Sequence, residues 1–289
     1  MIDKYTVVTN INIVLLFCII IFYAIYFPIR IRKKIINEYE YFESMPNIID
    51  DDIYVKFYDK VFDQKEIYEE NAKLVGKYVN DKEYIKILDT GCGVGKHHQL
   101  IRKKYKDIIG IDKNNSFVKW AKIRNPHSTF IVDDFRSIEL FPPKKFSHIT
   151  CLLDTIYHNN IEDINAILRN FNFWLKDDGF LIINIFIKDK LDPAPREFSQ
   201  YYFDENKTKH SLTYFENFTH DAWWDGTDYY QQYINKDGKS FLKKHELYIE
   251  HEDNMIKYID DNGFKIVDTH KYDNLDIKDM ILVICQKKI

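Results

Sequence analysis

The chain has 289 residues, of which 45% are hydrophobic and 16% aromatic, so it can bury a large core and is not a disordered protein. Its formal net charge is only -4, and charges of both signs are mixed along the sequence, which excludes a broad nucleic-acid-binding face. The four cysteines show no zinc-ligand spacing, so we expect reduced, structural thiols and no metal site.

The first segment carries no charged residue from position 5 to position 29, and residues 11–27 are almost wholly apolar. Because this length can span a bilayer, we expect residues 1–29 to be a transmembrane anchor. A cleavable signal peptide and a buried core helix are the alternatives. The positive charges follow the apolar run, whereas a signal peptide carries them before it. These charges place the rest of a single-pass membrane protein in the cytosol.

Residues 30–52 form a charged juxtamembrane linker. Helical patterns then run over residues 52–62 and 66–79. Tyr54 and Tyr58 lie four positions apart and would share one helix face. Core packing explains both tyrosines, and a position over a ligand is the alternative.

The most informative stretch covers residues 85–95. A short apolar run, typical of a buried parallel strand, ends at Asp89, and a helical pattern begins at Lys96. Glycine occupies every second position between them, which keeps Cβ atoms away from a ligand and permits positive φ in a tight turn. A dinucleotide fingerprint would need glycine or alanine in place of Lys96, and Asp89 would repel a pyrophosphate but attract an ammonium group. A glycine-rich turn without a ligand is the remaining alternative.

This stretch resembles motif I of the class I S-adenosylmethionine-dependent methyltransferases, and Lys96-His97-His98 resembles the Gly-Arg/Lys-His variants of that family. The resemblance implies S-adenosyl-L-methionine as the cofactor. It also implies that residues 52–62 cap the cofactor, with Tyr54 and Tyr58 on the substrate side. The residues that it places around the cofactor in this stretch are Asp89, Gly91, Cys92, Gly93 and Gly95.

Two acidic positions downstream extend the expected cofactor site. Asp112 ends the second predicted strand, 23 residues after Asp89, and a carboxylate there can accept hydrogen bonds from both ribose hydroxyls of an adenosine. Lys113, which follows it, is included in the site. After the helix 115–124 and the strand 129–132, the resemblance implies that Asp134 faces the adenine amino group and that Phe135 covers the ring. A solvated acidic loop is the alternative there.

The fourth predicted strand, residues 146–153, ends at a candidate catalytic segment. Ligands bind at the carboxyl ends of parallel strands, so Leu153 is included in the cofactor site. Residues 154–159 resemble motif IV of the family, with His158 at a position where many members carry histidine. We expect His158, or secondly Tyr157, to accept a proton or to orient the substrate, although a lone histidine is often structural.

Residues 188–247 interrupt the alternation of strands and helices. Three strands are expected there, over 212–218, 229–234 and 241–248, and they would build an antiparallel substrate lid. The lid is rich in aromatic rings that could surround a methylammonium group or a flat acceptor, with ordinary packing as the alternative. Its candidate substrate residues are Trp223, Trp224 and Tyr229.

The expected fold class is α/β, with a folded domain over residues 53–289. Strands alternating with helices imply right-handed crossovers and a doubly wound sheet. The last predicted helix, over 252–261, precedes two strands, 264–272 and 280–286, which resemble the antiparallel hairpin that ends this family's fold. The resemblance thus implies a seven-stranded, mostly parallel sheet in the order 3-2-1-4-5-7-6, with the lid as an insertion and the transmembrane helix at the amino terminus.

The resemblance implies a methyltransferase that acts on a small-molecule or lipid acceptor at a membrane surface. The expected chemistry is in-line transfer of the sulfonium methyl group to N, O or C, driven mainly by alignment of the reactants in a dry pocket. A protein methyltransferase and a membrane-tethered, non-catalytic cofactor-binding scaffold are the alternatives. No nucleic-acid partner is expected, since residues 154–157 are not an Asn/Asp-Pro-Pro-Tyr/Phe motif.

Overall fold

The central sheet of the protein has seven strands. The structure is a computed structural model, and it describes residues 51–78, 85–193, 199–216, 218–235 and 240–288. These residues belong to one compact unit, Ile49–Ile289. The predicted membrane anchor lies outside the described residues, as does nearly all of the predicted linker. Among the residues that are described, no helix combines the length and the apolar character needed to cross a membrane.

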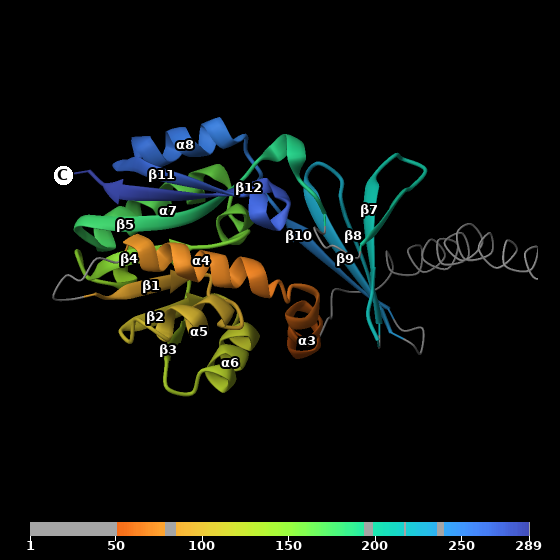
Figure 1. The fold of residues 1–289 in the computed structure, drawn as a ribbon, viewed down its shortest axis with the longest axis horizontal. Coiled ribbons are helices and arrows are strands. Elements are labelled where there is room, and N and C mark those ends of the chain that lie inside the picture. Colours follow the sequence, from red (N-terminus) through yellow and green to blue (C-terminus); the bar gives the residue numbers. More distant parts are fainter. Residues whose placement is uncertain (1–50, 79–84, 194–198, 217, 236–239, 289) are drawn as a thin grey trace, which may run out of the picture. The chain divides into compact units, whose positions relative to one another are not determined.

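The sheet confirms the predicted strand order. Its strands are β1 (Ile87–Thr90), β2 (Ile108–Asp112), β3 (Thr129–Val132), β4 (Phe146–Cys151), β5 (Leu175–Phe186), β11 (Phe264–Tyr272) and β12 (Ile277–Lys287). They lie in the order β11-β12-β5-β4-β1-β2-β3, as Figure 1 shows. The first five are mutually parallel, whereas β12 is antiparallel to β5 and β11 is antiparallel to β12.

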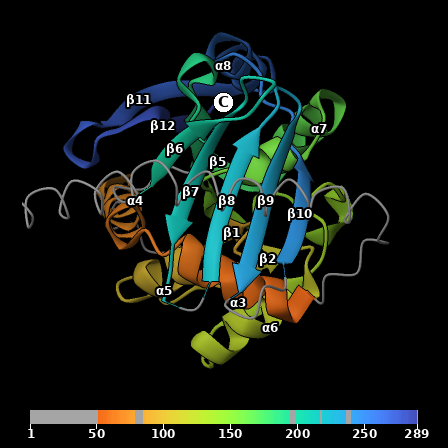
Figure 2. The same cartoon turned by 90° about the vertical axis from the view of Figure 1, so that its right-hand side faces the viewer.

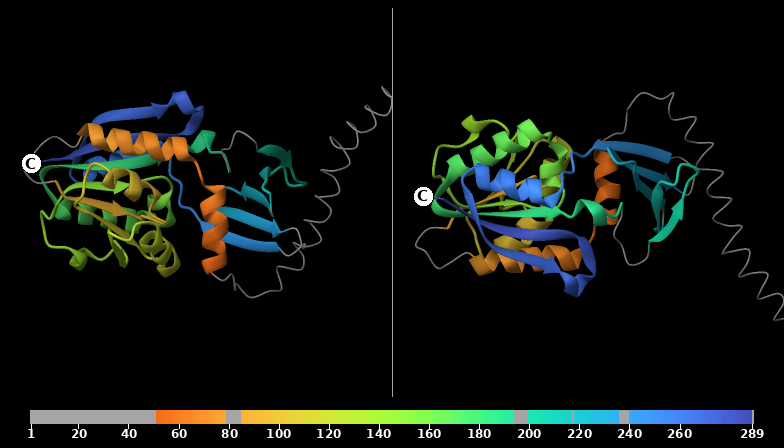
Figure 3. Two further views of the ribbon diagram at one scale, coloured as in Figure 1. Left: turned by 60° about the horizontal axis from the view of Figure 1, so that its bottom comes forward. Right: turned by 90° about the horizontal axis from the view of Figure 1, so that it is seen from above.

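Helices cover both faces of this sheet. The helices α7 (Ile161–Trp174) and α8 (Glu252–Asp261) pack on one face, and α4 (Lys65–Tyr78) and α5 (Lys96–Arg102) pack on the other (Figure 3). Ile183 of β5 belongs to the first core and the adjacent Ile182 to the second, because successive side chains of a strand point to opposite faces. The inner strands are therefore apolar on both faces, as the sequence pattern predicted.

A second sheet of five antiparallel strands, here called the lid sheet, follows β5 in the sequence. Its strands are β6 (Gln200–Phe203), β7 (Lys209–Tyr214), β8 (Phe218–Trp224), β9 (Asp228–Asn235) and β10 (Ser240–Glu246). They are paired in the order β10-β9-β8-β7-β6, which Figure 2 shows from its broad side. An antiparallel lid was predicted, with three strands.

One of the three predicted lid strands is wrong. The segment 212–218 contains the end of β7, a tight turn and the first residue of β8, since the Phe215 N–H donates to the Phe218 carbonyl across the hairpin at 2.9 Å. Aromatic residues run through this turn without a glycine or proline to mark it, so the pattern resembled one strand. The predicted strands 229–234 and 241–248 overlap β9 and β10.

The helix α3 (Asp51–Val61) connects the lid sheet to the rest of the unit. The Phe57 ring lies 4.7 Å from that of Phe218 and 5.1 Å from that of Tyr233, measured between ring centroids. On another side of α3, the Tyr58 ring lies 5.0 Å from that of Phe117 in α6 (Asn115–Arg124). The same helix therefore contacts the lid sheet and the helix that follows β2, and its tyrosines are held between them.

Candidate functional site

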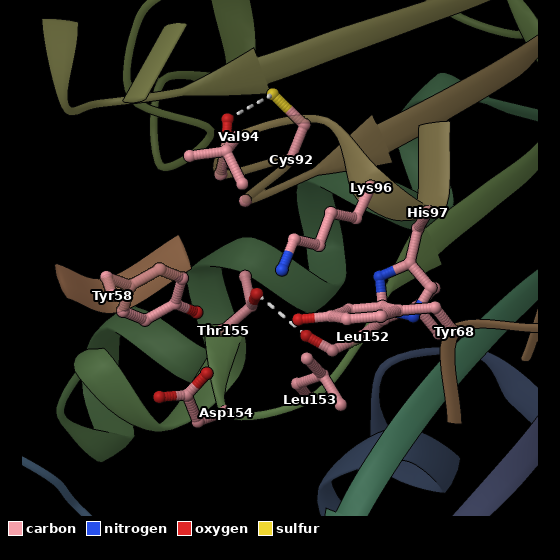
Figure 4. A pocket seen from close by; sticks show the side chains of 12 residues that line it. Tyr58, Tyr68, Cys92, Val94, Lys96, His97, Leu152, Leu153, Asp154 and Thr155 are labelled. Carbon is pink, nitrogen blue, oxygen red and sulfur yellow. Dashed lines mark hydrogen bonds between the residues drawn. The ribbon is translucent and has the colours of Figure 1, made fainter. Parts of the chain in front are cut away.

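A hollow opens at the carboxyl ends of β1 and β4 (Figure 4). The empty space there, open solvent included, is about 360 Å³. Two neighbouring segments form its floor: the glycine loop, Gly91–Gly95, and the strand-end segment, Leu152–Thr155. They are neighbours because β1 pairs with β4 in parallel, Thr90 opposite Cys151. The other lining residues are Tyr58 from α3, Tyr68 from α4, and Lys96 and His97 from α5.

The glycine loop has the conformation that its sequence predicts. Gly91, Gly93 and Gly95 have φ of +61°, +50° and +76°, a region that favours glycine. A Cβ on Gly91 would lie 2.2 Å from Thr155 Cγ2, so this glycine lets the two floor segments touch. A Cβ on Gly93 would meet no atom within 4 Å, so the backbone there is open to the hollow.

Asp112 holds the glycine loop from the end of β2. One carboxylate oxygen accepts a hydrogen bond from the Gly93 N–H at 3.0 Å, and the other accepts one from the Asn114 N–H at 2.9 Å. Burial raises the pKa of this carboxyl, although the two N–H groups counteract part of that rise. Lys113, beside it, is exposed. Asp112 therefore lies where the sequence placed it, at the strand end beside the open Gly93.

Asp89 lies beneath the loop rather than in the wall of the hollow, and only 2% of the residue is exposed. Its Oδ1 accepts a hydrogen bond from the Thr150 hydroxyl at 2.9 Å. Its Oδ2 has no hydrogen-bond partner among the described residues; His98 Nδ1 lies 3.9 Å away, and burial lowers the pKa of that imidazole to about 4, so it is neutral. Burial, together with the charge of Asp112, raises the pKa of Asp89 to about 7. This carboxyl is thus poised between its neutral and ionised forms near neutral pH.

The remaining predicted cofactor residues divide into two groups. Cys92 and Leu153 line the hollow, and Gly95 precedes the first residue of α5. Asp134 instead forms an ion pair with Arg136 at 2.6 Å, while Phe135 is buried and packs on Phe171 in the core. Neither Asp134 nor Phe135 lines the hollow. Their roles at an adenine stay predictions.

A polar cluster, here called the acceptor cluster, joins the hollow to the lid sheet. Asp154 lines the hollow, and its Oδ2 lies 3.2 Å from His158 Nε2. The His158 ring lies 5.6 Å from that of His245 in β10, and His245 Nε2 lies 3.0 Å from the Tyr54 hydroxyl. Although burial opposes it, the hydrogen bond and charge of His158 hold the pKa of Asp154 below its usual value, whereas burial lowers the pKa of His245 to about 3 and leaves that ring neutral. Asp154 is therefore an anion at neutral pH.

Three tyrosines lie within the electrostatic reach of Asp154. The pKa values of Tyr58, Tyr68 and Tyr229 are all raised, mainly by burial and next by the charge of Asp154. Figure 4 shows Tyr58 and Asp154 as part of the same lining. A carboxylate that lines a hollow together with the rings of Tyr58 and Tyr68 is a suitable environment for a small cation.

Two predicted residues lie away from this cluster. Tyr157 is fully buried in the main core, where its hydroxyl accepts a hydrogen bond from the Phe186 N–H at 2.9 Å. This geometry gives Tyr157 a packing role. Trp223 stacks on Tyr230 at 5.0 Å, on the opposite face of the lid sheet from the adjacent Trp224. Of the predicted lid residues, Trp224 and Tyr229 are cross-strand partners, and Tyr229 lies 6.2 Å from His245.

Several lining residues were not in the predicted site. Asp154 was visible as an acid at a strand end, and Lys96 and His97 were visible as the residues after the glycine loop. His245 gave no local signal, because it reaches His158 only through the fold of the lid. Lys96 donates hydrogen bonds to the Asp59 carbonyl at 2.8 Å and to Asp63 at 3.1 Å, which ties α5 to the end of α3.

Comparisons with known proteins agree with this geometry. Residues 87–179 match the family model described as "Methyltransferase domain". The chain is 27% identical to phosphoethanolamine N-methyltransferase 1 of Arabidopsis thaliana over 206 residues, which is 66% of this chain and 41% of the relative. It is 30% identical to dTDP-4-amino-2,3,4,6-tetradeoxy-D-glucose N,N-dimethyltransferase of Saccharopolyspora spinosa over 98 residues, 34% of this chain and 39% of the relative. The chain thus spans about two fifths of the length of these relatives.

Solved structures share the fold. An S-adenosylmethionine-dependent methyltransferase from Clostridium acetobutylicum ATCC 824 has a TM-score of 0.61 at 19% identity, over 82% of this chain and 98% of that one. An amino pentose methyltransferase from Micromonospora echinaspora, solved with S-adenosylmethionine bound, has a TM-score of 0.59 at 14% identity, over 84% of this chain and 100% of that one. The comparisons therefore support the predicted enzyme class and cofactor: residues 87–179 match a methyltransferase domain, and S-adenosylmethionine-dependent methyltransferases share the fold.

The pKa of Asp89 predicts a dependence of stability on pH. The unfolded carboxyl ionises near pH 4 and the folded one near pH 7, so folding is increasingly opposed as the pH rises between these values. Asp89→Asn removes this charge, so we expect the variant to gain free energy of unfolding relative to the wild type. The gain should be larger at pH 8 than at pH 5, by about 3 kcal/mol. Urea denaturation at both pH values measures this, with the exposed Asp253→Asn as control. An equal effect at both pH values would contradict the assignment.

Proposed function

We propose that this chain, through its methyltransferase domain, is an S-adenosylmethionine-dependent N-methyltransferase of a small molecule that carries an amine. The observation that supports this most directly is the Asp154 carboxylate, which lines the hollow among tyrosines and is paired with His158. An anion among aromatic rings attracts a protonated amine through charge and through cation–π contact.

The residues around the glycine loop fit the cofactor. Gly93 leaves its backbone open to a ligand, and Asp112 presents oxygens that can accept hydrogen bonds from ribose hydroxyls beside it. Asp89, with one oxygen that lacks a hydrogen-bond partner among the described residues, supplies negative charge for an ammonium group above the loop. When bound, S-adenosylmethionine supplies a methyl group that is already activated by its sulfonium. The protein therefore has to position the acceptor and to remove one proton from it.

The acceptor cluster can perform both tasks. Asp154 binds the ammonium form of the acceptor, and His158 takes the proton so that the neutral amine can attack. Asp154 then stabilises the charged imidazole, since their side chains lie 3.2 Å apart. About 31% of the His158 side chain is exposed, so the proton can pass on to solvent. The rings of Tyr58 and Tyr68 line the same hollow and limit the access of water to the amine.

The relatives support an amine acceptor. The names of the two relatives described above denote methylation of nitrogen, in phosphoethanolamine and in an amino sugar. The alignment with the phosphoethanolamine enzyme covers 66% of this chain and that with the sugar enzyme covers 34%. We therefore propose a phosphoethanolamine-like amine as the preferred methyl acceptor and an amino sugar as the second candidate.

If the protein is anchored in a membrane, lipid headgroups that carry an amine can also serve as methyl acceptors. The support for it is the uncharged segment 5–29 followed by basic residues, which we propose to be a single-pass anchor with the methyltransferase domain in the cytosol. The full-length chain should stay in membranes after a carbonate wash, and a chain that starts at residue 38 should be released. Release of the full-length chain would refute the anchor.

Cofactor binding is tested by calorimetric titration of the full-length chain with S-adenosylhomocysteine. We expect micromolar affinity for the wild type and a loss of at least about tenfold in Asp112→Ala, because the hydrogen bonds to Gly93 and Asn114 and the ribose acceptor are removed. Asp253→Ala, an exposed acid in α8, serves as the control. A folded wild type that does not bind would refute both the enzyme and the cofactor-binding scaffold.

Acceptor chemistry is tested by transfer of labelled methyl groups to phosphoethanolamine. We expect Asp154→Asn to raise KM for the amine strongly, and His158→Gln to lower kcat about 100-fold, the usual size of a lost general base. Neither variant should change the affinity for S-adenosylhomocysteine by more than about threefold, and exposed His251→Gln should behave as the wild type. Unchanged turnover in both variants would remove the acceptor cluster from the mechanism.

A further inference from the structure

A chain of buried hydrogen bonds runs from the strand-end segment to His97, and we call it the buried polar chain. The Leu153 N–H donates to Asn184 Oδ1 at 2.7 Å, and Asn184 Nδ2 donates to the Tyr272 hydroxyl at 2.8 Å. The Tyr272 hydroxyl donates to Asn71 Oδ1, and Asn71 Nδ2 lies 3.1 Å from His97 Nε2. Asn71, Asn184 and Tyr272 are fully buried, and His97 is 9% exposed.

The Leu153 N–H determines which group donates and which accepts at each step of the buried polar chain. A backbone N–H can only donate, so the oxygen of Asn184 must face Leu153 and its NH₂ group must face Tyr272. That NH₂ group also donates to the Ile281 carbonyl at 3.3 Å, which can only accept. The orientation of the Asn184 amide is therefore determined by two backbone groups.

The orientation of the Asn71 side-chain amide is determined in the same way. Since the Tyr272 oxygen already accepts from Asn184, its own hydrogen has to go to the oxygen of Asn71. If Asn71 were turned over, the Tyr272 hydrogen would be buried without an acceptor, which destabilises the folded state. The Asn71 NH₂ group consequently faces His97 and needs an acceptor there.

His97 can meet this need in one form only. Its Nε2 must be unprotonated, and since burial and then the charge of Lys96 lower the pKa of the ring to about 3, the neutral ring carries its proton on Nδ1. No described residue accepts a hydrogen bond from this Nδ1. The Tyr68 ring stands edge to face with the imidazole at 4.6 Å, so the ring cannot easily rotate.

We propose that the buried polar chain fixes His97 as an Nδ1–H donor to the carboxylate at the amino-acid end of the cofactor. This inference rests on the proposed function. Of the side chains that line the hollow, only those of His97 and Lys96 contain nitrogen, and both follow the glycine loop directly (Figure 4). A carboxylate ligand is therefore best accommodated on this side, away from the anionic Asp154.

The protonation state of His97 is tested by NMR. In full-length protein with ¹⁵N-labelled histidine, long-range ¹H–¹⁵N correlations should show His97 Nδ1 protonated and Nε2 unprotonated, with the resonance assigned by its loss in His97→Gln. In Asn71→Asp, which replaces the donating NH₂ group by an oxygen of the same size, Nε2 should gain a proton. A protonated Nε2 in the wild type would overturn the inference, whether or not any variant folds.

Ligand binding is tested with two matched variants. In His97→Asn the amide nitrogen can take the position of Nδ1, whereas in His97→Gln the amide reaches only the position of Nε2. Calorimetric titration with S-adenosylhomocysteine should give about tenfold weaker binding for the Gln variant, the size of one hydrogen bond to a charged group, and less than about threefold for the Asn variant. Binding of 5′-methylthioadenosine, which lacks the amino-acid end, should be unchanged in both.

The outcomes separate the two proposals. If the wild type binds neither compound, the proposed function itself fails. If it binds both but the two variants weaken S-adenosylhomocysteine equally or not at all, the role of His97 fails alone. An equal loss for 5′-methylthioadenosine would also overturn that role, because it would show that the substitution damages the adenosine side of the site.

Discussion

The parallel pairing of β1 with β4 is the constraint on which the site depends. Their register places Thr90 opposite Cys151, so both strands end at the same level and the glycine loop lies against the strand-end segment. The contact is close enough that Thr155 occupies the space where a side chain on Gly91 would be. Everything that lines the floor of the hollow follows from this register, including the position of Asp154.

The side of the site opposite the glycine loop is formed by α3 and the lid sheet. Aromatic packing between elements that are distant in sequence holds these two parts in place. Phe57 packs α3 on the lid sheet, and Tyr58 packs it on α6. The same helix presents Tyr54 to His245, and His245 lies beside His158. The lid sheet therefore contributes His245 to the acceptor cluster, where it contacts Tyr54 and His158.

The parts of the fold that depend on local pattern could be predicted from the sequence. The bounds of α6, β3 and α8 agree with the predicted segments, and Asp112 lies beside Gly93 because both mark the ends of adjacent strands. Alternation along β8 would have separated Trp223 from Trp224, since adjacent strand residues face opposite sides. That signal was present and was not used.

The rest could not be predicted, because the information lies in contacts between distant segments. His245 meets His158 only after the lid has folded, and Asn71 looks like any polar residue of a helix until Tyr272 reaches it. Tyr157 has the sequence position of a catalytic residue, but the Phe186 N–H occupies its hydroxyl. The roles assigned to the site residues remain predictions that depend on a bound ligand.

The order of strands at one edge of the central sheet has a consequence for assembly. β12 follows β11 in the sequence but lies between β11 and β5, so β11 cannot join the sheet until β12 has been inserted. Tyr272, at the end of β11, connects Asn184 of β5 to Asn71 of α4. This link between β5 and α4 can therefore form only after β12 has joined the sheet, and a ribosome-bound chain whose β12 has not yet emerged would hold a glycine loop without this support.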